Sequence, residues 1–369
     1  MQVTAQPSSE LGLDSTNAVR MPADEPLGLD VFIAVMGATG SGKSSFINLM
    51  SGSSLSVGEG LRSCTSRIEL GKTFELDGSR VTLVDTPGFD DTTVSDTEIL
   101  KMISAYLSSS YQGGIKLSGV IYMHRISDIR IGGISRRNFG MFRKLCGDDS
   151  LKNVVIVTNM WGEVSREKGV AREEELKTDE LLFKPVLAKG ATMLRNYNTV
   201  QSARLILRQL LGNRPQALQL QRELVDEGRD ITQTEAGVEL DREMVALMAE
   251  HKKQIAEIRA EMDAAISRKD LETKAELDEV RHELEGKIQQ LALDRERVSR
   301  EYAVEKEKAD EKMRDLHAEL EVERQQRQDR WDEMERLMAG LEATNAHREE
   351  MQRRIDELEH RNSGPCTVQ

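Results

Sequence analysis

The sequence predicts an α/β domain, in which helices cover both faces of a mostly parallel sheet, followed by a long α-helical coiled coil. Three observations predict this order. Short apolar runs rich in β-branched residues alternate with helix-compatible segments over 31–211. A glycine-rich loop separates the first such run from the first helix. Between residues 216 and 364 proline is absent, and apolar residues recur at steps of three and four.

The composition limits what the chain does. Its 369 residues contain 38% hydrophobic, 4% aromatic and 31% charged residues, so part of the length is expected to lie outside any core. The net charge of −13 argues against a nucleic-acid-binding surface. No apolar run approaches the roughly 18 residues of a transmembrane helix. Three cysteines do not make a disulfide framework, so a cytoplasmic location is expected.

The glycine-rich loop predicts a nucleotide-binding P-loop. The strand expected at 31–36 runs into Gly-x-x-x-x-Gly-Lys-Ser, and the helix expected at 43–51 follows at once. Lys43 would place its charge on the β- and γ-phosphates, and the hydroxyl of Ser44 would bind Mg²⁺. The alternative is a plain turn before a helix. The predicted phosphate-binding residues are Gly37, Ala38, Thr39, Gly40, Ser41, Gly42, Lys43, Ser44 and Ser45.

Two further segments are expected to complete the phosphate site. In the glycine- and serine-rich loop 51–66, Thr65 is the candidate hydroxyl for the metal, although it is one hydroxyl among several. A hairpin formed by 68–76 and 81–84 then ends in Asp-Thr-Pro-Gly. Asp85 is predicted to hold Mg²⁺ and the amide of Gly88 to contact the γ-phosphate. The predicted catalytic residues are therefore Lys43, Thr65 and Gly88, and the predicted metal residues are Ser44, Thr65 and Asp85.

These motifs together resemble the septin-like branch of P-loop GTPases that includes the GIMAP-type proteins. The stretches 119–128, 135–147 and 154–161 are most similar to the fungal G-domain proteins (50S ribosome-binding GTPase-like) related to that branch. The resemblance covers about 31–212 and implies a P-loop NTPase G domain that takes GTP, GDP and Mg²⁺. The other elements expected in it are helices 96–110, 135–146, 167–182 and 199–211, strands 119–123 and 153–158, a last strand with its neighbouring segments at 183–194, and a base-side loop near 188–192.

The base-reading motif departs from that family. Related GTPases carry Asn/Thr-Lys-x-Asp after the strand at 153–158, whereas here Trp161 stands where the aspartate would be. Asn159 could bond the base and Trp161 could stack on it, or Glu163 could supply the missing carboxylate. Trp161 could equally only cap the core. Asn159 and Trp161 are the predicted base-side residues.

A second departure concerns the attacking water. Phe89 follows Asp-Thr-Pro-Gly directly, where many GTPases carry a glutamine nearby, and phenylalanine cannot hydrogen-bond water. Asp90 or Asp91 could replace the glutamine, or a second chain could complete the site through Arg125 or His124. Either arrangement predicts slow hydrolysis by the isolated monomer.

The chain is predicted to divide into a disordered leader (1–29), a G domain (30–212), a linker or helix (213–239), a coiled coil (240–361) and a tail (362–369). A stripe of two apolar residues per heptad needs a partner helix, so a homodimer is expected through the coiled coil, with the G domain as a second contact. As one rod, 240–360 would reach roughly 180 Å. A charged single helix and a disordered region are the alternatives.

The last four residues, Cys366-Thr-Val-Gln, fit a prenylation box and predict reversible membrane association. The alternative is that a cysteine occurs at this position by chance. The functional interpretation is a Mg²⁺-dependent GTP-binding protein with slow GTP hydrolysis, whose nucleotide state controls self-assembly or partner binding. The alternative is a coiled-coil scaffold with a structural or inactive nucleotide site.

Overall fold

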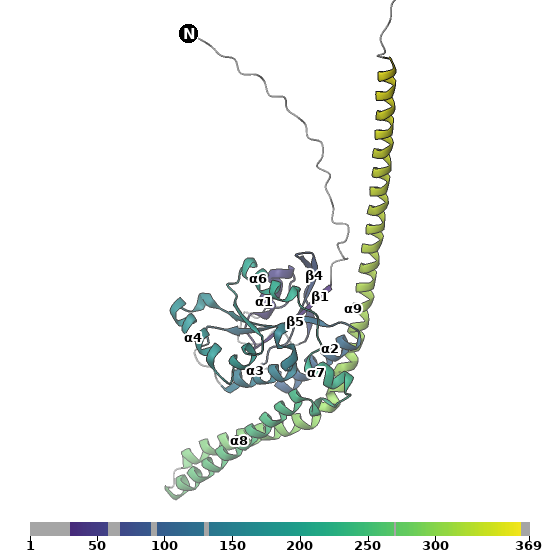
Figure 1. Ribbon diagram of the computed structural model, residues 1–369. Coiled ribbons are helices and arrows are strands. Elements are labelled where there is room, and N and C mark those ends of the chain that lie inside the picture. The colour runs from purple at the N-terminus through teal and green to yellow at the C-terminus, as the bar shows by residue number, and fades with distance from the viewer. Residues whose placement is uncertain (1–29, 58–66, 90–93, 129–132, 269–270, 363–369) are drawn as a thin grey trace, which may run out of the picture.

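The computed structural model describes residues 30–57, 67–89, 94–128, 133–268 and 271–362 (Figure 1). The expected leader at 1–29, Thr65, the aspartates Asp90 and Asp91, and Cys366 lie outside these ranges. The predictions that concern them stay predictions.

The centre of the molecule is one mostly parallel sheet. In the described residues its order is β2-β4-β1-β5-β6-β7, with β3 also paired to β4. β1 pairs in parallel with β4 and β5, and the ladder continues in parallel through β6 to β7, whereas β2 and β3 run antiparallel to β4. The strand expected at 68–76 is therefore two short strands. The bounds are β1 (Asp30–Gly37), β2 (Glu69–Leu70), β3 (Phe74–Leu76), β4 (Ser79–Asp85), β5 (Leu117–Arg125), β6 (Val154–Asn159) and β7 (Thr192–Arg195).

Helices cover both faces of the sheet, as the alternation of strand and helix predicts. Alternate residues of β1 belong to two separate apolar clusters. Phe32, Ala34 and Met36 pack with α2, α3 and α5, while Val31, Ile33 and Val35 pack with α1 and α6. Residues 184–187, expected with the last strand, are helical instead. The bounds are α1 (Lys43–Ser51), α2 (Asp96–Gln112), α3 (Gly133–Cys146), α4 (Arg166–Thr178), α5 (Lys184–Leu187) and α6 (Val200–Leu211).

The segment 213–239, expected as a linker or helix, is packed onto the outer side of α2 and α3. It contains α7 (Gln219–Gln221) and two further short helical turns, Arg222–Asp226 and Ile231–Gln233. Gln221 is fully buried and its side-chain amide donates to the carbonyl of Leu107 in α2 at 2.9 Å. Glu223 is also buried, and Arg229 pairs with it at 3.2 Å. This connection therefore extends the core of the α/β domain.

The helical tail is not one rod. α8 (Glu235–Arg268) runs away from the domain and α9 (Leu271–Asn362) runs back beside it (Figure 1). Asp241 pairs with Arg295 and Arg259 pairs with Glu285, so residue numbers rise on one helix as they fall on the other. The helices are thus antiparallel, and the first part of the apolar stripe finds its partner helix inside the same chain. Residues 240–360 therefore do not have the length that one continuous rod would have.

The middle of α9 lies against α2. The hydroxyls of Ser108 and Tyr302 are 3.1 Å apart, and Lys306 donates to the side chain of Gln112 at 2.7 Å. Lys101 is buried in α2 and forms an ion pair with Glu301 of α9. Farther along α9, Arg324 reaches Asp30 at the start of β1 at 3.2 Å. Beyond this contact α9 projects away from the domain (Figure 1). Within the described residues, none of the helices is long and apolar enough to cross a membrane.

Candidate nucleotide-binding site

The loop between β1 and α1 is wound as a phosphate-binding loop requires. Gly40 and Gly42 have φ values of +73° and +93°, which residues with a Cβ rarely adopt. At Gly42 a Cβ would also lie 2.3 Å from the side-chain nitrogen of Asn159. Lys43 is buried and its ammonium donates to the carbonyls of Gly37 and Ala38, each at 3.1 Å. The charge predicted to meet the phosphates is therefore held inside the curve of the loop.

Ser44 and Asp85, predicted as metal residues from separate motifs, are brought together. The Ser44 hydroxyl donates to one oxygen of Asp85 at 2.6 Å. The other oxygen, Oδ1, is buried and has no hydrogen-bond partner among the described residues. Burial raises the pKa of Asp85, against the opposing effects of the Ser44 hydrogen bond and the charge of Lys43. A buried carboxylate oxygen without a partner beside a serine hydroxyl fits a hydrated Mg²⁺.

The segment after β4 is fastened to the P-loop through Thr39. The amide of Thr39 donates to the carbonyl of Phe89 at 3.0 Å, and its hydroxyl donates to the carbonyl of Gly88 at 3.2 Å. A Cβ at Gly88 would lie 2.5 Å from the Thr39 nitrogen, so only glycine allows this approach. The phenyl ring of Phe89 is completely buried in the core. Phe89 therefore presents no side chain to a water at the phosphates.

Asn159, at the end of β6, supports the P-loop. Its side-chain amide donates to the carbonyl of Ser41 at 2.9 Å, and its oxygen accepts from the side chain of Asn196 at 3.1 Å. Asn196 follows β7 and also accepts a hydrogen bond from Ser202 at 2.9 Å. Both polar atoms of the Asn159 side chain thus form hydrogen bonds that position the P-loop. The role expected from the sequence is a contact with the base.

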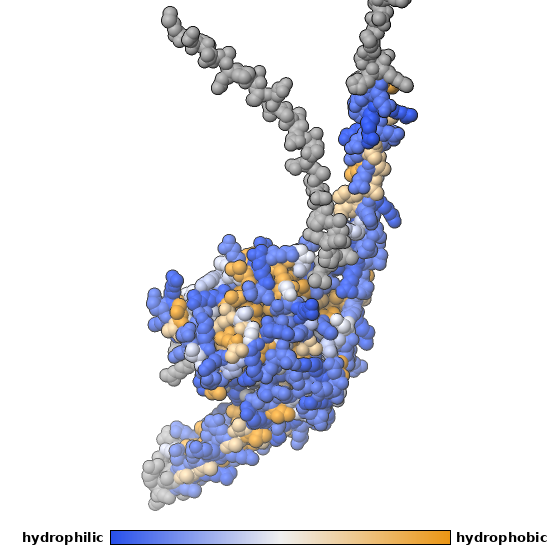
Figure 2. Space-filling model, viewed as in Figure 1, coloured by the Kyte–Doolittle hydropathy of each residue, from blue (hydrophilic) through white to orange (hydrophobic). Residues whose placement is uncertain are grey.

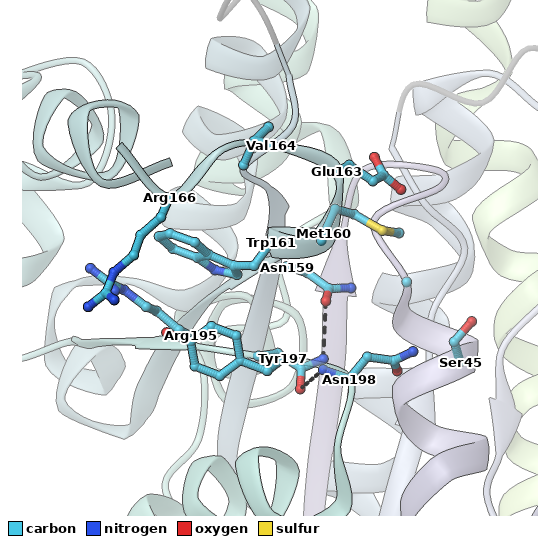
Figure 3. A pocket seen from close by; sticks show the side chains of 13 residues that line it. Ser45, Asn159, Met160, Trp161, Glu163, Val164, Arg166, Arg195, Tyr197 and Asn198 are labelled. Atoms are coloured by element: carbon cyan, nitrogen blue, oxygen red, sulfur yellow. Dashed lines mark hydrogen bonds between the residues drawn. The ribbon is translucent and has the colours of Figure 1, made fainter. Parts of the chain in front are cut away.

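A cavity of about 790 Å³ opens beside Gly42 and Ser45 of the P-loop (Figure 3). Its walls come from the segment after β6, 159–164, and from the segment after β7, 195–198. Residues 195–198, at the carboxyl end of β7, therefore line the cavity. The segment 188–192, where a base-side loop is expected, leads into β7 and does not line it. The polar run Asn-Tyr-Asn-Thr between a strand and a helix is the signal that could have located the segment 195–198.

Trp161 forms one wall of this cavity. Its indole nitrogen donates to the carbonyl and the hydroxyl of Thr158, each at 3.1 Å. The guanidinium of Arg195 lies 4.4 Å from the centre of the indole ring, a cation–π contact. Trp161 also packs on the apolar core, as expected for a residue that caps it. The same side chain lines the cavity, so the core-capping position and the predicted base-side position are compatible.

Arg195 is held in position by a buried carboxylate that the sequence analysis missed. Glu173 in α4 is buried and accepts two hydrogen bonds from the Arg195 Nε, at 3.0 and 3.2 Å, and one from its Nη2 at 2.6 Å. Burial by itself would raise the pKa of Glu173, but the bonds from Arg195 and Lys177 outweigh it and lower that pKa. Glu163, which also lines the cavity, lies beside Met160, on the side opposite Arg166 and Arg195 (Figure 3).

The two residues considered for assistance between chains lie at the carboxyl end of β5. A Cβ at Gly40 would lie 3.2 Å from a guanidinium nitrogen of Arg125, so this side chain reaches the P-loop of its own chain. Arg125 also pairs with Asp128 at 3.0 Å. His124 packs edge-on against the ring of Phe183, with centroids 5.5 Å apart, and burial lowers the pKa of its imidazole to about 4.

A glycine-rich loop after a central parallel strand, with a lysine and a serine that meets a strand-end aspartate, defines a P-loop nucleotide-binding domain. Residues 32–159 match the family described as 50S ribosome-binding GTPase. The match runs from β1 to the end of β6 and contains the P-loop, Asp85 and Asn159. It confirms the resemblance to P-loop GTPases. No curated protein sequence matches the chain.

Solved structures of GTPases share parts of the fold. Toc33 from Arabidopsis thaliana, in complex with GDP and Mg²⁺, is 14% identical with a TM-score of 0.40, over 51% of this chain and 87% of that one. Era from Aquifex aeolicus, bound to GDP and AlF₄⁻, is 18% identical with a TM-score of 0.37, over 51% of this chain and 58% of that one.

Proposed function

We propose that this protein is a Mg²⁺-dependent GTP-binding protein that hydrolyses GTP slowly and whose nucleotide state controls self-assembly or partner binding through its helices. The observation that carries the proposal is the pairing of Ser44 with Asp85, whose second oxygen is buried without a partner among the described residues. Few structural roles would explain such an oxygen, whereas a metal site does. When bound, Mg²⁺ would neutralise charge on the β- and γ-phosphates.

The phosphates would be held by this chain's loop and lysine. Lys43 donates to two loop carbonyls in this structure, and on nucleotide binding it would donate to phosphate oxygens instead. The amide of Gly88 would contact the γ-phosphate from the segment that Thr39 fastens. Thr65 would add its hydroxyl to the metal. We assign Lys43, Gly88 and Thr65 to catalysis, and Ser44, Asp85 and Thr65 to the metal.

The base would occupy the cavity between the segments after β6 and β7. Guanine presents the N1 and N2 hydrogens together and needs an acceptor, and Glu163 carries the only carboxylate among the described residues that line this cavity. Trp161, held by Arg195, would provide the apolar wall. Asn159 acts on the base only indirectly, because its amide holds the P-loop at Ser41. GTP is therefore the nucleotide that this cavity favours.

Slow hydrolysis would follow from Phe89. Because its ring is in the core, this position cannot orient the attacking water. The same observation favours a second candidate function, a scaffold with a structural or inactive nucleotide site. Phosphate release under saturating GTP separates the two: a steady rate that disappears in Lys43→Ala supports the GTPase, and a bound nucleotide that is never hydrolysed supports the scaffold.

Nucleotide binding is tested by calorimetry of the full chain with GTP, GDP and ATP, with and without Mg²⁺. Lys43→Ala should weaken GTP binding at least about 100-fold, because charge-assisted hydrogen bonds to phosphate are lost. The exposed Lys72→Ala is the matched control and should bind normally. Glu163→Gln should lower the preference for GTP over ATP by about 10-fold or more. Equal affinities of Lys43→Ala and the unchanged chain would refute the proposal.

A further inference from the structure

The last part of α9 carries apolar side chains that the rest of the described chain leaves exposed. Among the described residues, the last ion pairs of α9 with the domain are those of Arg324 and Arg327 with Asp30. Beyond them the helix projects alone, with apolar side chains between charged ones (Figures 1 and 2). Eight of these side chains are 38% to 64% exposed. They are Trp331, Met334, Leu337, Met338, Leu341, Met351, Ile355 and Leu358.

Six of them, all except Trp331 and Met338, form one stripe of alternating three- and four-residue steps. Starting from Met334, the first heptad position falls on Leu341, Arg348 and Ile355. The fourth falls on Leu337, Thr344, Met351 and Leu358. Only Arg348 and Thr344, adjacent in the middle of the stripe, are not apolar. A stripe of this width buries itself against one partner helix.

The two polar positions distinguish the ways in which two copies can pair. In a parallel pair each residue faces itself, so two Arg348 guanidinium groups would meet in the seam at the cost of like-charge repulsion. In an antiparallel pair centred near Ala346, a first-position residue faces a fourth-position residue. Arg348 then faces Thr344 of the other copy, whose hydroxyl can accept its hydrogen bond.

The antiparallel arrangement also matches each of the six apolar residues of the stripe with another of them. With that centre, Met334 faces Leu358, Leu337 faces Ile355 and Leu341 faces Met351, and the same three layers repeat on the other side by symmetry. Two copies of the stripe can therefore pair in opposite directions over its whole length, Met334 to Leu358. A two-fold axis with one self-complementary surface is the commonest symmetry of dimers.

We propose that the projecting part of α9, residues 328–362, forms an antiparallel two-stranded coiled coil with the same segment of a second copy of this chain. The proposal deepens the self-assembly part of the proposed function and names its surface, partner and direction. α8 and the first part of α9 take no part, because they already pack on each other and on α2. At 1.5 Å per residue, roughly 57 Å of helix axis separates the two copies of Arg327.

This separation has a mechanistic consequence. The G domains would sit near opposite ends of the paired segment, so Arg125 or His124 of one copy could not reach the phosphates of the other within the same dimer. The dimer would instead present two nucleotide sites at a fixed distance. Any assistance between G domains would then require two different dimers to meet.

Association is tested first, with the full-length chain in sedimentation-velocity ultracentrifugation. The unchanged chain should form a dimer, and Leu341→Glu should raise the dissociation constant at least about 100-fold, since each dimer loses two buried leucines and gains two buried charges. Ala346→Glu introduces the same residue on the outward face of the helix and should leave the dimer intact. A monomeric unchanged chain, or equal effects of the two variants, would overturn the proposal. GTP affinity, measured by calorimetry at a concentration at which all three chains are monomeric, should be the same in both variants and in the unchanged chain.

Direction is tested by cross-linking with a short bis-maleimide, in full-length chains in which Cys64 and Cys366 are serine and the buried Cys146 is kept. An antiparallel dimer should cross-link Leu337→Cys only to Ile355→Cys when two size-tagged variants are mixed. A parallel dimer would cross-link each variant to itself, and that result would contradict the proposed direction. Absence of any cross-link in a chain that still dimerises would place the interface elsewhere and reject the surface.

Discussion

At the scale of single residues, Asn159 shows how one side chain coordinates three segments of the site. It joins the P-loop at Ser41 to the end of β6 and to Asn196 after β7. Under the proposed function, a base between the last two segments would be held in register with phosphates on the first. Positioning of this kind acts on affinity without any contact to the ligand.

We predict that Asn159→Ala weakens GTP binding by about 10- to 100-fold, because the buried carbonyl of Ser41 loses its donor and the loop loses its support. Calorimetry with GTP measures the effect. Gln201→Ala, at an exposed position of α6, is the control and should bind as the unchanged chain does. An unchanged affinity in Asn159→Ala would show that the loop holds its shape without this bond.

His124 gives a prediction for pH. Burial lowers its pKa from 6.5 to about 4, although the nearby Asp128 opposes the shift. Below pH 6.5 the imidazole of His124 is protonated in the unfolded chain, whereas in the folded chain it stays neutral down to about pH 4. The free energy of unfolding should therefore fall as the pH falls from 6.5 to 4. The loss assigned to His124 approaches about 3 kcal/mol at pH 4. Urea unfolding between pH 7 and 4 should show a shallower loss in His124→Gln, and parallel curves for both chains would contradict the assignment.

At the scale of elements, the hairpin of α8 and α9 depends on few buried side chains. Ile255 on α8 and Leu284 on α9 are both buried. Neither residue belongs to the two large apolar clusters on the faces of the sheet. We predict that Ile255→Ala or Leu284→Ala opens this part of the hairpin at a cost of about 2–4 kcal/mol. Hydrogen exchange of α8 amides should accelerate in both variants. Val280→Ala, at an exposed position of α9, should exchange as the unchanged chain does.

Elements also show what could be predicted from the sequence. The strand at 31–36, the P-loop and the helix at 43–51 were correct, because their residue types fix local dihedrals and faces without help from distant segments. The paired site of Ser44 and Asp85 followed from two motifs at the ends of adjacent parallel strands. The antiparallel pairing of α8 and α9 could not be predicted, because an apolar stripe shows that a helix needs a partner helix but does not show which helix that is. Glu173 was missed because a buried acid in a charged helix looks like its exposed neighbours.

At the scale of the whole molecule, α2 lies between the sheet and α9. It begins soon after the segment that Thr39 holds to the P-loop, and it contacts α9 through Lys101 and Ser108. A nucleotide-dependent shift of the segment after β4 would therefore be passed to the helix that carries the proposed dimer surface. This arrangement links the two parts of the proposed function through one helix.

The same packing predicts where the chain can be shortened. The larger apolar cluster of the α/β domain includes residues beyond 212, among them Leu220, Ile231, Met244 and Val298. A chain that ends at Gly212, the boundary expected from sequence, would expose the outer sides of α2 and α3 to water. We predict that it is insoluble or melts at least about 10 °C below the full chain, since several large apolar side chains leave the core.

A chain that ends at Gln328 is the matched control. It keeps the contacts of α9 with the domain as far as Arg327 and loses only the projecting segment. It should melt within about 2 °C of the full chain and bind GTP as tightly as the monomeric full chain does, because the site and its supporting core are unchanged. If the chain ending at Gly212 melts with the full chain, the helices contribute nothing to the stability of the domain, and the coupling through α2 has no structural basis.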